Sequence, residues 1–177
     1  MGSDRKVILY IATSLDGFIA GHDDDLGFLS MVEKEGEDYG YHDFTSEVDT
    51  VIMGRKTFDK VMSMGFGNPH EDKELLIITR NSRPSLSNEK YYTGSLTDLI
   101  QSLKAKEGKH IYCDGGAEIV HELLKNKLLD EMIISVIPIL LGAGVRLFKD
   151  DRPEQKMVLV KSTPFETGLL QVHYRLL

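Results

Sequence analysis

The stretch HIYCDGGAEIVHELLKNKL, residues 110–128, decides the fold class. It passes from a short apolar strand, predicted over His110–Cys113, through two consecutive glycines into a segment with apolar residues at helical spacing. The same succession occurs earlier, where the apolar run Val48–Met53 passes through a glycine into a helix predicted over Arg55–Met64. Strands that alternate with helices in this way are typical of α/β proteins with a mainly parallel sheet.

The remaining segments extend this pattern and then depart from it. Strand and helix patterns predict further elements at Val7–Ala12, Glu74–Thr79, Lys90–Thr93, Ser95–Lys106 and Glu118–Leu128. A further helix is predicted over Val32–Glu47, interrupted by Gly36 and Gly40. Three strand-like segments then follow without a helix between them, at Glu131–Leu141, Met157–Thr163 and Leu169–Leu176. We therefore expect one domain over residues 1–177, with a mainly parallel sheet that ends in antiparallel strands at one edge.

The composition excludes several classes of protein. The chain of 177 residues carries 21 Lys and Arg against 28 Asp and Glu, a formal net charge of −7, so nucleic acid and anionic membranes are poor partners. Its one cysteine, Cys113, cannot form an internal disulfide or a cysteine-based metal site. The histidines show no metal-binding spacing, and no apolar run suits a membrane span or a signal peptide. We expect a cytoplasmic protein without a metal.

Loops that follow the predicted strands carry glycines, cations and hydroxyl groups. In parallel sheets such loops open at the carboxyl ends of the strands, where small ligands bind. After Gly54 the helix begins with Arg55, Lys56 and Thr57, although cations at a helix N-terminus oppose the helix dipole. A bound anion removes this conflict, because backbone amides, both cations and the hydroxyl group would hold phosphate oxygens.

Two further loops suit the same kind of ligand. Thr79 and Arg80 place a hydroxyl group and a guanidinium group directly after a strand. The segment Gly115-Gly116-Ala117-Glu118 lets a ligand approach the backbone at the start of a helix. The pattern lacks the third glycine and the later acidic residue of the Rossmann dinucleotide fingerprint. Together the loops predict a phosphate-rich nucleotide that lies across the edge of the sheet.

The residues in these loops resemble those of a known family. Gly54-Arg55-Lys56-Thr57, Thr79-Arg80-Asn81 and Gly115-Gly116-Ala117, in that order, resemble the cofactor-binding elements of dihydrofolate reductase. The segments Ser14–Ala20 and Leu129–Phe148 resemble the reductase domain at the C-terminal end of the bifunctional riboflavin-biosynthesis deaminase-reductase. The resemblance covers Val7–Leu177 and includes no deaminase domain, so the chain is similar to stand-alone relatives of that reductase domain.

The resemblance implies a fold, a cofactor and a reaction. The fold is the dihydrofolate reductase-like three-layer α/β/α arrangement, and NADPH is the hydride donor. The acceptor is a pterin- or pyrimidine-type small molecule, such as 5-amino-6-(5-phosphoribosylamino)uracil. By the same resemblance, Ala12 and Ile19 lie near the nicotinamide, while Gly54–Thr57 and Gly115–Glu118 hold the pyrophosphate. Arg55 or Lys56, together with Arg80, surrounds the adenosine 2′-phosphate, and the Gly115–Gly116 peptide bond is cis.

The residues that recognise the substrate follow less directly from the resemblance. Dihydrofolate reductases place one carboxylate on the helix before the second strand, and here either Asp38 or Asp43 takes that position. Asp16 lies in the 14–30 segment, which we expect to act as a lid over the site. The deaminase-reductase pattern has a lysine two residues before the alanine at the end of the first strand. Tyr10 occupies that position here.

Two other functions are compatible with the sequence. The chain could bind NADP(H) as a sensor or scaffold without turnover, or it could be a structural module that assembles through its C-terminal strands. We also expect a homodimer through those strands, because they carry Ile133, Val136, Ile137 and Leu140, which are more apolar than a solvated sheet edge.

Overall fold

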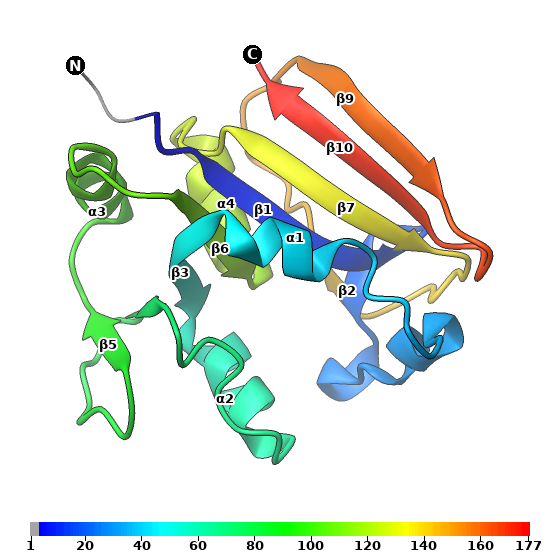
Figure 1. The fold of residues 1–177 in the computed structure, drawn as a ribbon, viewed down its shortest axis with the longest axis horizontal. Helices are drawn as coiled ribbons and strands as arrows, with labels where there is room; N and C mark the ends of the chain where they lie inside the picture. The colour runs from blue at the N-terminus through cyan, green and yellow to red at the C-terminus, as the bar shows by residue number, and fades with distance from the viewer. Residues whose placement is uncertain (1–3) are drawn as a thin grey trace.

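The computed structural model describes residues 4–177 and forms the predicted α/β fold (Figure 1). Within these residues, one sheet has eight strands in the order β5-β4-β3-β6-β1-β7-β10-β9. The strands are β1 (Val7–Ser14), β3 (Val48–Gly54), β4 (Glu74–Ile78), β5 (Glu89–Tyr92), β6 (His110–Gly115), β7 (Glu131–Ile137), β9 (Met157–Pro164) and β10 (Leu170–Leu176). All pairings from β5 to β7 are parallel, whereas β10 and β9 are antiparallel to their neighbours.

Helices cover both faces of the parallel part of the sheet. They are α1 (Tyr41–Ser46), α2 (Arg55–Ser63), α3 (Leu96–Lys104) and α4 (Ala117–Lys125), with 3-10 turns η1 (His22–Asp24) and η2 (Gly27–Val32). Alternate residues of β3 face opposite sides: Ile52 belongs to the core under α3 and α4, and Val51 to the core under α1 and α2. Burial of each such side chain contributes about 1.5–3 kcal/mol to the stability of the fold. Because both faces of the sheet are buried in this way, the helix–sheet–helix arrangement is stabilised from both sides.

The segment before β3 differs from the helix predicted over Val32–Glu47. Only Tyr41–Ser46 forms an α-helix there. Gly36 and Gly40 have φ angles of +78° and +77°, so the chain turns at both glycines and cannot continue a right-handed helix. The predicted helix is therefore confirmed only over Tyr41–Ser46, and the interruptions at the two glycines are turns of the chain.

The C-terminal strands also correct one part of the prediction. The strand predicted over Glu131–Leu141 ends at Ile137 and runs parallel to β1, between β1 and β10. The apolar residues on it therefore do not form the sheet edge; Ile137, for example, is fully buried. A short strand that the sequence did not predict, β8 (Val145–Arg146), pairs with β2 (Phe18–Ala20) outside the main sheet.

Candidate functional site

The carboxyl ends of adjacent parallel strands bring the predicted loops to one edge of the sheet. β4, β3, β6 and β1 are neighbours in that order. In the strand register Gly54 lies opposite Ile78, and Met53 lies opposite Gly115. The loops that begin at Thr79, Gly54 and Gly115 are therefore neighbours in space, as expected for a ligand that crosses the ends of several strands.

The two glycine turns lie against each other. A Cβ atom added to Gly54 would lie 3.3 Å from the Ile119 side chain and 3.8 Å from the Gly116 amide nitrogen. A Cβ atom added to Gly116 would lie 2.8 Å from Thr57 Oγ1. The Gly115–Gly116 peptide bond is cis, as the resemblance implies. Because these positions lack side chains, a ligand can approach the backbone amides closely.

Some of the cations near the glycine turns already have partners. Arg55 Nη1 donates to Asp59 Oδ2 at 2.9 Å, one helical turn further along α2. Arg83 also pairs with Asp59 and donates from Nε to Tyr91 Oη at 2.8 Å. The carboxylate of Asp59 therefore already offsets the charge of Arg55.

Lys56 and Arg80 are the better candidates to hold an anion. Both side chains are exposed, and within residues 4–177 neither makes a side-chain hydrogen bond or an ion pair. Lys56 lies in the first turn of α2, and Arg80 follows the adjacent strand β4. Thr79 Oγ1 is engaged within its own turn, where it accepts from the Asn81 amide at 3.3 Å.

The start of α4 offers backbone amides but no free carboxylate. Ala117 is buried beneath the turn, and Glu118 pairs with Lys149. The hydrogen bond from Lys149 is the largest cause that lowers the pKa of Glu118, and the charge of Lys56 lowers it further. The negative charge of Glu118 is therefore partly offset by these lysines. The groups that this first turn can offer a phosphate are its backbone amides.

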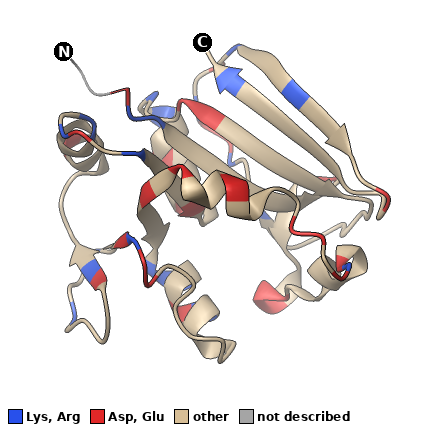
Figure 2. Ribbon diagram, viewed as in Figure 1, with Lys and Arg blue, Asp and Glu red and all other residues tan. Residues whose placement is uncertain are grey.

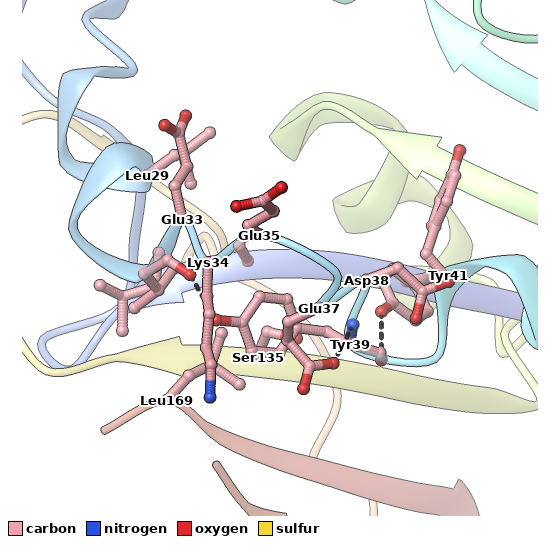
Figure 3. Close-up of a pocket in the computed structure, with 14 residues that line it drawn as sticks. Leu29, Glu33, Lys34, Glu35, Glu37, Asp38, Tyr39, Tyr41, Ser135 and Leu169 are labelled. Atoms are coloured by element: carbon pink, nitrogen blue, oxygen red, sulfur yellow. Dashed lines mark hydrogen bonds between the residues drawn. The ribbon is translucent and has the colours of Figure 1, made fainter. Parts of the chain in front are cut away.

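A cavity of about 620 Å³ opens beside β1 and β7 (Figure 3). Ala12, which the resemblance assigns to the neighbourhood of the nicotinamide, is one of the residues that line it. The walls are largely aromatic and aliphatic, with Tyr10, Tyr39, Tyr41, Leu29, Val32, Ile137 and Leu169. Charged residues of the 33–38 segment and Ser135 complete the lining. A cavity of this size that combines apolar surfaces with a few polar groups is typical of small-molecule sites.

Hydrogen bonds fix the polar groups at the base of this cavity. Gln171 Nε2 donates to Tyr10 Oη at 3.2 Å, to the Tyr39 carbonyl at 3.0 Å and to Ser135 Oγ at 3.1 Å. Tyr10 Oη donates to the same Tyr39 carbonyl at 2.9 Å. Burial raises the pKa of Tyr10, so a neutral phenol stands where the riboflavin-type pattern has a lysine.

The structure distinguishes the two candidate carboxylates. Asp38 lines the cavity, although it lies in the turn before α1 and not on a helix. Its carboxylate accepts the amides of Gly40 and His42, both at 2.9 Å, and these bonds lower its pKa. Asp43 is exposed on α1 and is not among the residues that line the cavity. Of the two candidates, Asp38 is therefore the carboxylate that lines the cavity.

The predicted lid is held to the rest of the fold over its first part. Leu147 donates its amide to the Gly17 carbonyl at 3.0 Å, and β2 pairs with β8. Ile19 packs against the main core and does not line the cavity. Residues 14–20 are thus an anchored strand and turn, and any lid movement is confined to the segment after them.

Asp16 holds two loops together. Its carboxylate accepts from Ser14 Oγ at 2.6 Å and from the amides of Leu141 and Gly142 at 3.1 and 2.8 Å. The Ser14 hydrogen bond is the largest cause that lowers the pKa of Asp16 to about 2. This geometry gives Asp16 a structural role, and it lies outside the cavity lining.

The Asp16→Asn variant tests this role through the pH dependence of stability. The folded-state pKa lies below the ordinary value, so the ionised carboxylate stabilises the fold above about pH 4, and this contribution is lost as the pH falls toward about 2. We expect the variant to be less stable than the unchanged protein at pH 7, with the difference disappearing over that acid range. Urea denaturation at several pH values measures it, and Asp24→Asn is the control. A difference that does not change with pH would contradict the assignment.

One cluster near the site was missed by the sequence analysis. Asp114, which directly precedes the paired glycines, lies between His70 Nε2 and Tyr112 Oη at 2.8 Å each. His70 is only 1% exposed. Tyr41 packs edge-on against Tyr112, with ring centroids 6.4 Å apart, so it lies beside this cluster as well as in the cavity wall. Burial, followed by the charge of Asp114, raises the pKa of Tyr41 to about 12. The position of Asp114 before Gly115 was a usable signal, whereas His70 lies in an irregular segment with none.

The described residues offer neither a membrane-spanning helix nor a cluster of metal ligands. No helix within residues 4–177 is long and apolar enough to cross a bilayer. The same residues contain no group of three or more His, Cys, Asp or Glu side chains that could hold a metal ion. Cys113 is buried in the core, and burial raises the pKa of its thiol to about 12.

Comparisons with known proteins place the chain among reductase-like folds. The RibD C-terminal domain model matches residues 5–171. YwjB of Bacillus subtilis (strain 168), an uncharacterized protein, is 39% identical over 97% of this chain and 98% of its own length. A putative riboflavin biosynthesis protein from Shewanella sp. PV-4 superimposes with a TM-score of 0.88 at 32% identity, covering 97% of this chain and 99% of the other.

A more distant structure shares the fold alone. Dihydrofolate reductase from Enterococcus faecalis, complexed with NADP(H), superimposes with a TM-score of 0.65 at 14% identity over 99% of each chain. The three-layer arrangement with a mainly parallel sheet and antiparallel C-terminal strands, which the sequence predicts, is therefore confirmed.

Proposed function

The chain belongs to the RibD C-terminal domain family, and on that basis we propose that it is an NADPH-dependent reductase of small heterocycles of the pterin or pyrimidine type. The observation that carries the proposal is the meeting of the two glycine turns with Lys56 and Arg80 at one sheet edge, next to the cavity that Ala12 lines. Phosphate-binding groups and an apolar cleft on adjacent strand ends suit a dinucleotide that reaches a small substrate.

The residues at the sheet edge fit the phosphates of NADPH. The open backbone at Gly54 and Gly116 would admit the pyrophosphate, and the amides of the first turn of α4 would donate to it. Lys56 and Arg80 would hold the adenosine 2′-phosphate, where each charge-assisted hydrogen bond contributes about 1.5–3 kcal/mol. When bound, NADPH would supply the hydride.

The cavity residues would position the acceptor and exclude water. Tyr39 and Tyr41 offer flat apolar walls, and the Tyr10–Ser135–Gln171 hydrogen bonds hold these polar groups in fixed orientations. Asp38 would stay ionised at neutral pH, because backbone amides lower its pKa. Hydride transfer depends more on this placement than on protein acids.

A sensor that binds NADP(H) without turnover is the second candidate. It is favoured by the combination of cofactor loops that match the family pattern with a cavity in which Tyr10 stands where the riboflavin-type pattern has a lysine. NADPH oxidation, followed at 340 nm with a panel of pterins and pyrimidines, separates the two functions. We expect oxidation with at least one heterocycle; binding of NADPH without oxidation by any of them would favour the sensor.

We also propose a homodimer whose interface is formed by the outer strand β9. Within the described residues β9 forms the end of the sheet, and its exposed apolar side chains include Leu159 and Val160, each 52% exposed. Unpaired edges with apolar side chains tend to pair with another chain. We expect sedimentation to give the mass of two chains and a Leu159→Lys, Val160→Lys variant to give one. A single-chain mass for the unchanged protein at all concentrations would contradict the dimer.

A further inference from the structure

The cavity beside β1 and β7 differs in charge from the cofactor loops. On the cofactor side, α2 and the loop after β4 contribute Lys56 and Arg80. On the cavity side, the segment between η2 and α1 is acidic, and Figure 2 shows red along it. Four acidic residues and one lysine line the cavity: Glu33, Glu35, Glu37, Asp38 and Lys34. The described part of the cavity lining is therefore strongly negative.

The single lysine does not offset this charge. Lys34 pairs with Glu166, which adds a fifth carboxylate to the neighbourhood. In Figure 3, Lys34 extends to the opposite side of the 33–41 segment from Glu33 and Glu35. Its positive charge is thus already balanced, and it is directed away from these two carboxylates.

The carboxylates of Glu33 and Glu35 have no cation of their own. Both are exposed, and within residues 4–177 neither makes a side-chain hydrogen bond or an ion pair. Figure 3 shows them on the same side of the segment as Tyr41, which forms part of the cavity wall. An anionic group that enters on this side would meet two negative charges that no cation of the described residues offsets.

The walls indicate what kind of molecule remains acceptable. Tyr39 and Tyr41 give flat surfaces suited to a planar ring. The polar groups at the base, Tyr10 Oη and Ser135 Oγ, are neutral hydroxyls. Neither hydroxyl offsets the negative charge of a phosphate or carboxylate. The amino and carbonyl groups of a heterocycle, in contrast, can form hydrogen bonds with such hydroxyls.

From this arrangement we propose that the cavity selects a neutral or positively charged planar heterocycle and rejects substrates that carry a phosphate or carboxylate group. The inference rests on the proposed reductase function and narrows its substrate class. It separates this chain from the phosphoribosyl-pyrimidine reductases, whose substrate carries a phosphate. Anions are directed to the cofactor loops, and the uncharged ring to the acidic cavity.

Matched ligand pairs test the proposal on the protein saturated with NADPH. Riboflavin and flavin mononucleotide share a ring and differ by a phosphate; pterin and pterin-6-carboxylate differ by a carboxylate. We expect the uncharged member of each pair to bind about tenfold more tightly at low salt, with a smaller preference at 0.5 M salt. Calorimetry with NADP⁺ in place of NADPH gives the same comparison without turnover.

Charge reversal supplies the decisive control. The Glu33→Lys, Glu35→Lys variant should lose or reverse the preference, while Glu107→Lys, Glu154→Lys, which changes the net charge equally outside the cavity, should keep it. Equal or tighter binding of the anionic members to the unchanged protein would overturn the inference. So would a failure of all four ligands to bind once NADPH is bound. If NADPH itself does not bind, the proposed function fails instead, which the same titrations show separately.

Discussion

A Lys56→Ala, Arg80→Ala double variant is expected to bind NADPH about 100-fold more weakly than the unchanged protein, while its affinity for NADH changes by less than about threefold. The reason is that both side chains are exposed, make no side-chain hydrogen bond or ion pair within residues 4–177, and follow the adjacent strands β3 and β4 beside the glycine turns. Two charge-assisted bonds to a 2′-phosphate would be lost, and NADH has no such phosphate. Fluorescence titration of both cofactors measures the change.

The control for this variant removes two positive charges elsewhere. Lys106→Ala, Lys156→Ala has the same effect on the net charge, and both lysines are exposed away from the sheet edge that carries the glycine turns. We expect its affinity for NADPH to stay within about twofold of the unchanged protein. Equal losses in the two double variants would mean that overall charge, and not a phosphate site, sets the affinity. A loss of NADH binding as large as that of NADPH would place these cations elsewhere on the dinucleotide.

The second large effect concerns stability and is expected for Gly144→Ala. Gly144 has a φ of +138°, and an added Cβ would overlap the carbonyl oxygen of Ala20 and lie 3.0 Å from Gly21 Cα. These are backbone atoms, so relief requires β8 and β2 to separate. We expect a loss of about 3 kcal/mol or more in the free energy of unfolding, measured by urea denaturation.

Gly142→Ala is the matched control in the same loop. Gly142 also has a positive φ, +75°, but nothing lies within 4 Å of an added Cβ. Only backbone strain then opposes the substitution, so we expect a loss of about 1 kcal/mol. If the two variants were equally stable, close packing of this loop against Ala20 would not contribute to the fold.

The parts of the fold that the sequence predicts are those encoded locally. The strand, the glycine turn and the helix at His110–Lys125 lie within one short stretch, and the apolar spacing of α4 is visible directly. The helix predicted before β3 is shorter in the structure, because Gly36 and Gly40 take left-handed φ angles. The sequence shows the two glycines but not the angles that they adopt. The two-residue strand β8 is too short to leave a pattern, and it exists only because it pairs with β2.

The same limit applies to the candidate site. The order of the loops predicts that Gly54, Thr79 and Gly115 meet at one edge, because parallel neighbours place their carboxyl ends together. The sequence does not show which of the cations is already engaged in an ion pair, as Arg55 is with Asp59. The pairing of Asp114 with a histidine 44 residues earlier in the chain is likewise a product of the fold.

The central claim, an NADPH site at this edge of the sheet, is tested most directly by calorimetric titration of the unchanged protein with NADPH and, in parallel, with NADH. We predict that NADPH binds at one site per chain and at least about tenfold more tightly than NADH. Equal affinities would contradict the roles of Lys56 and Arg80, and binding of neither cofactor would contradict the reductase proposal itself.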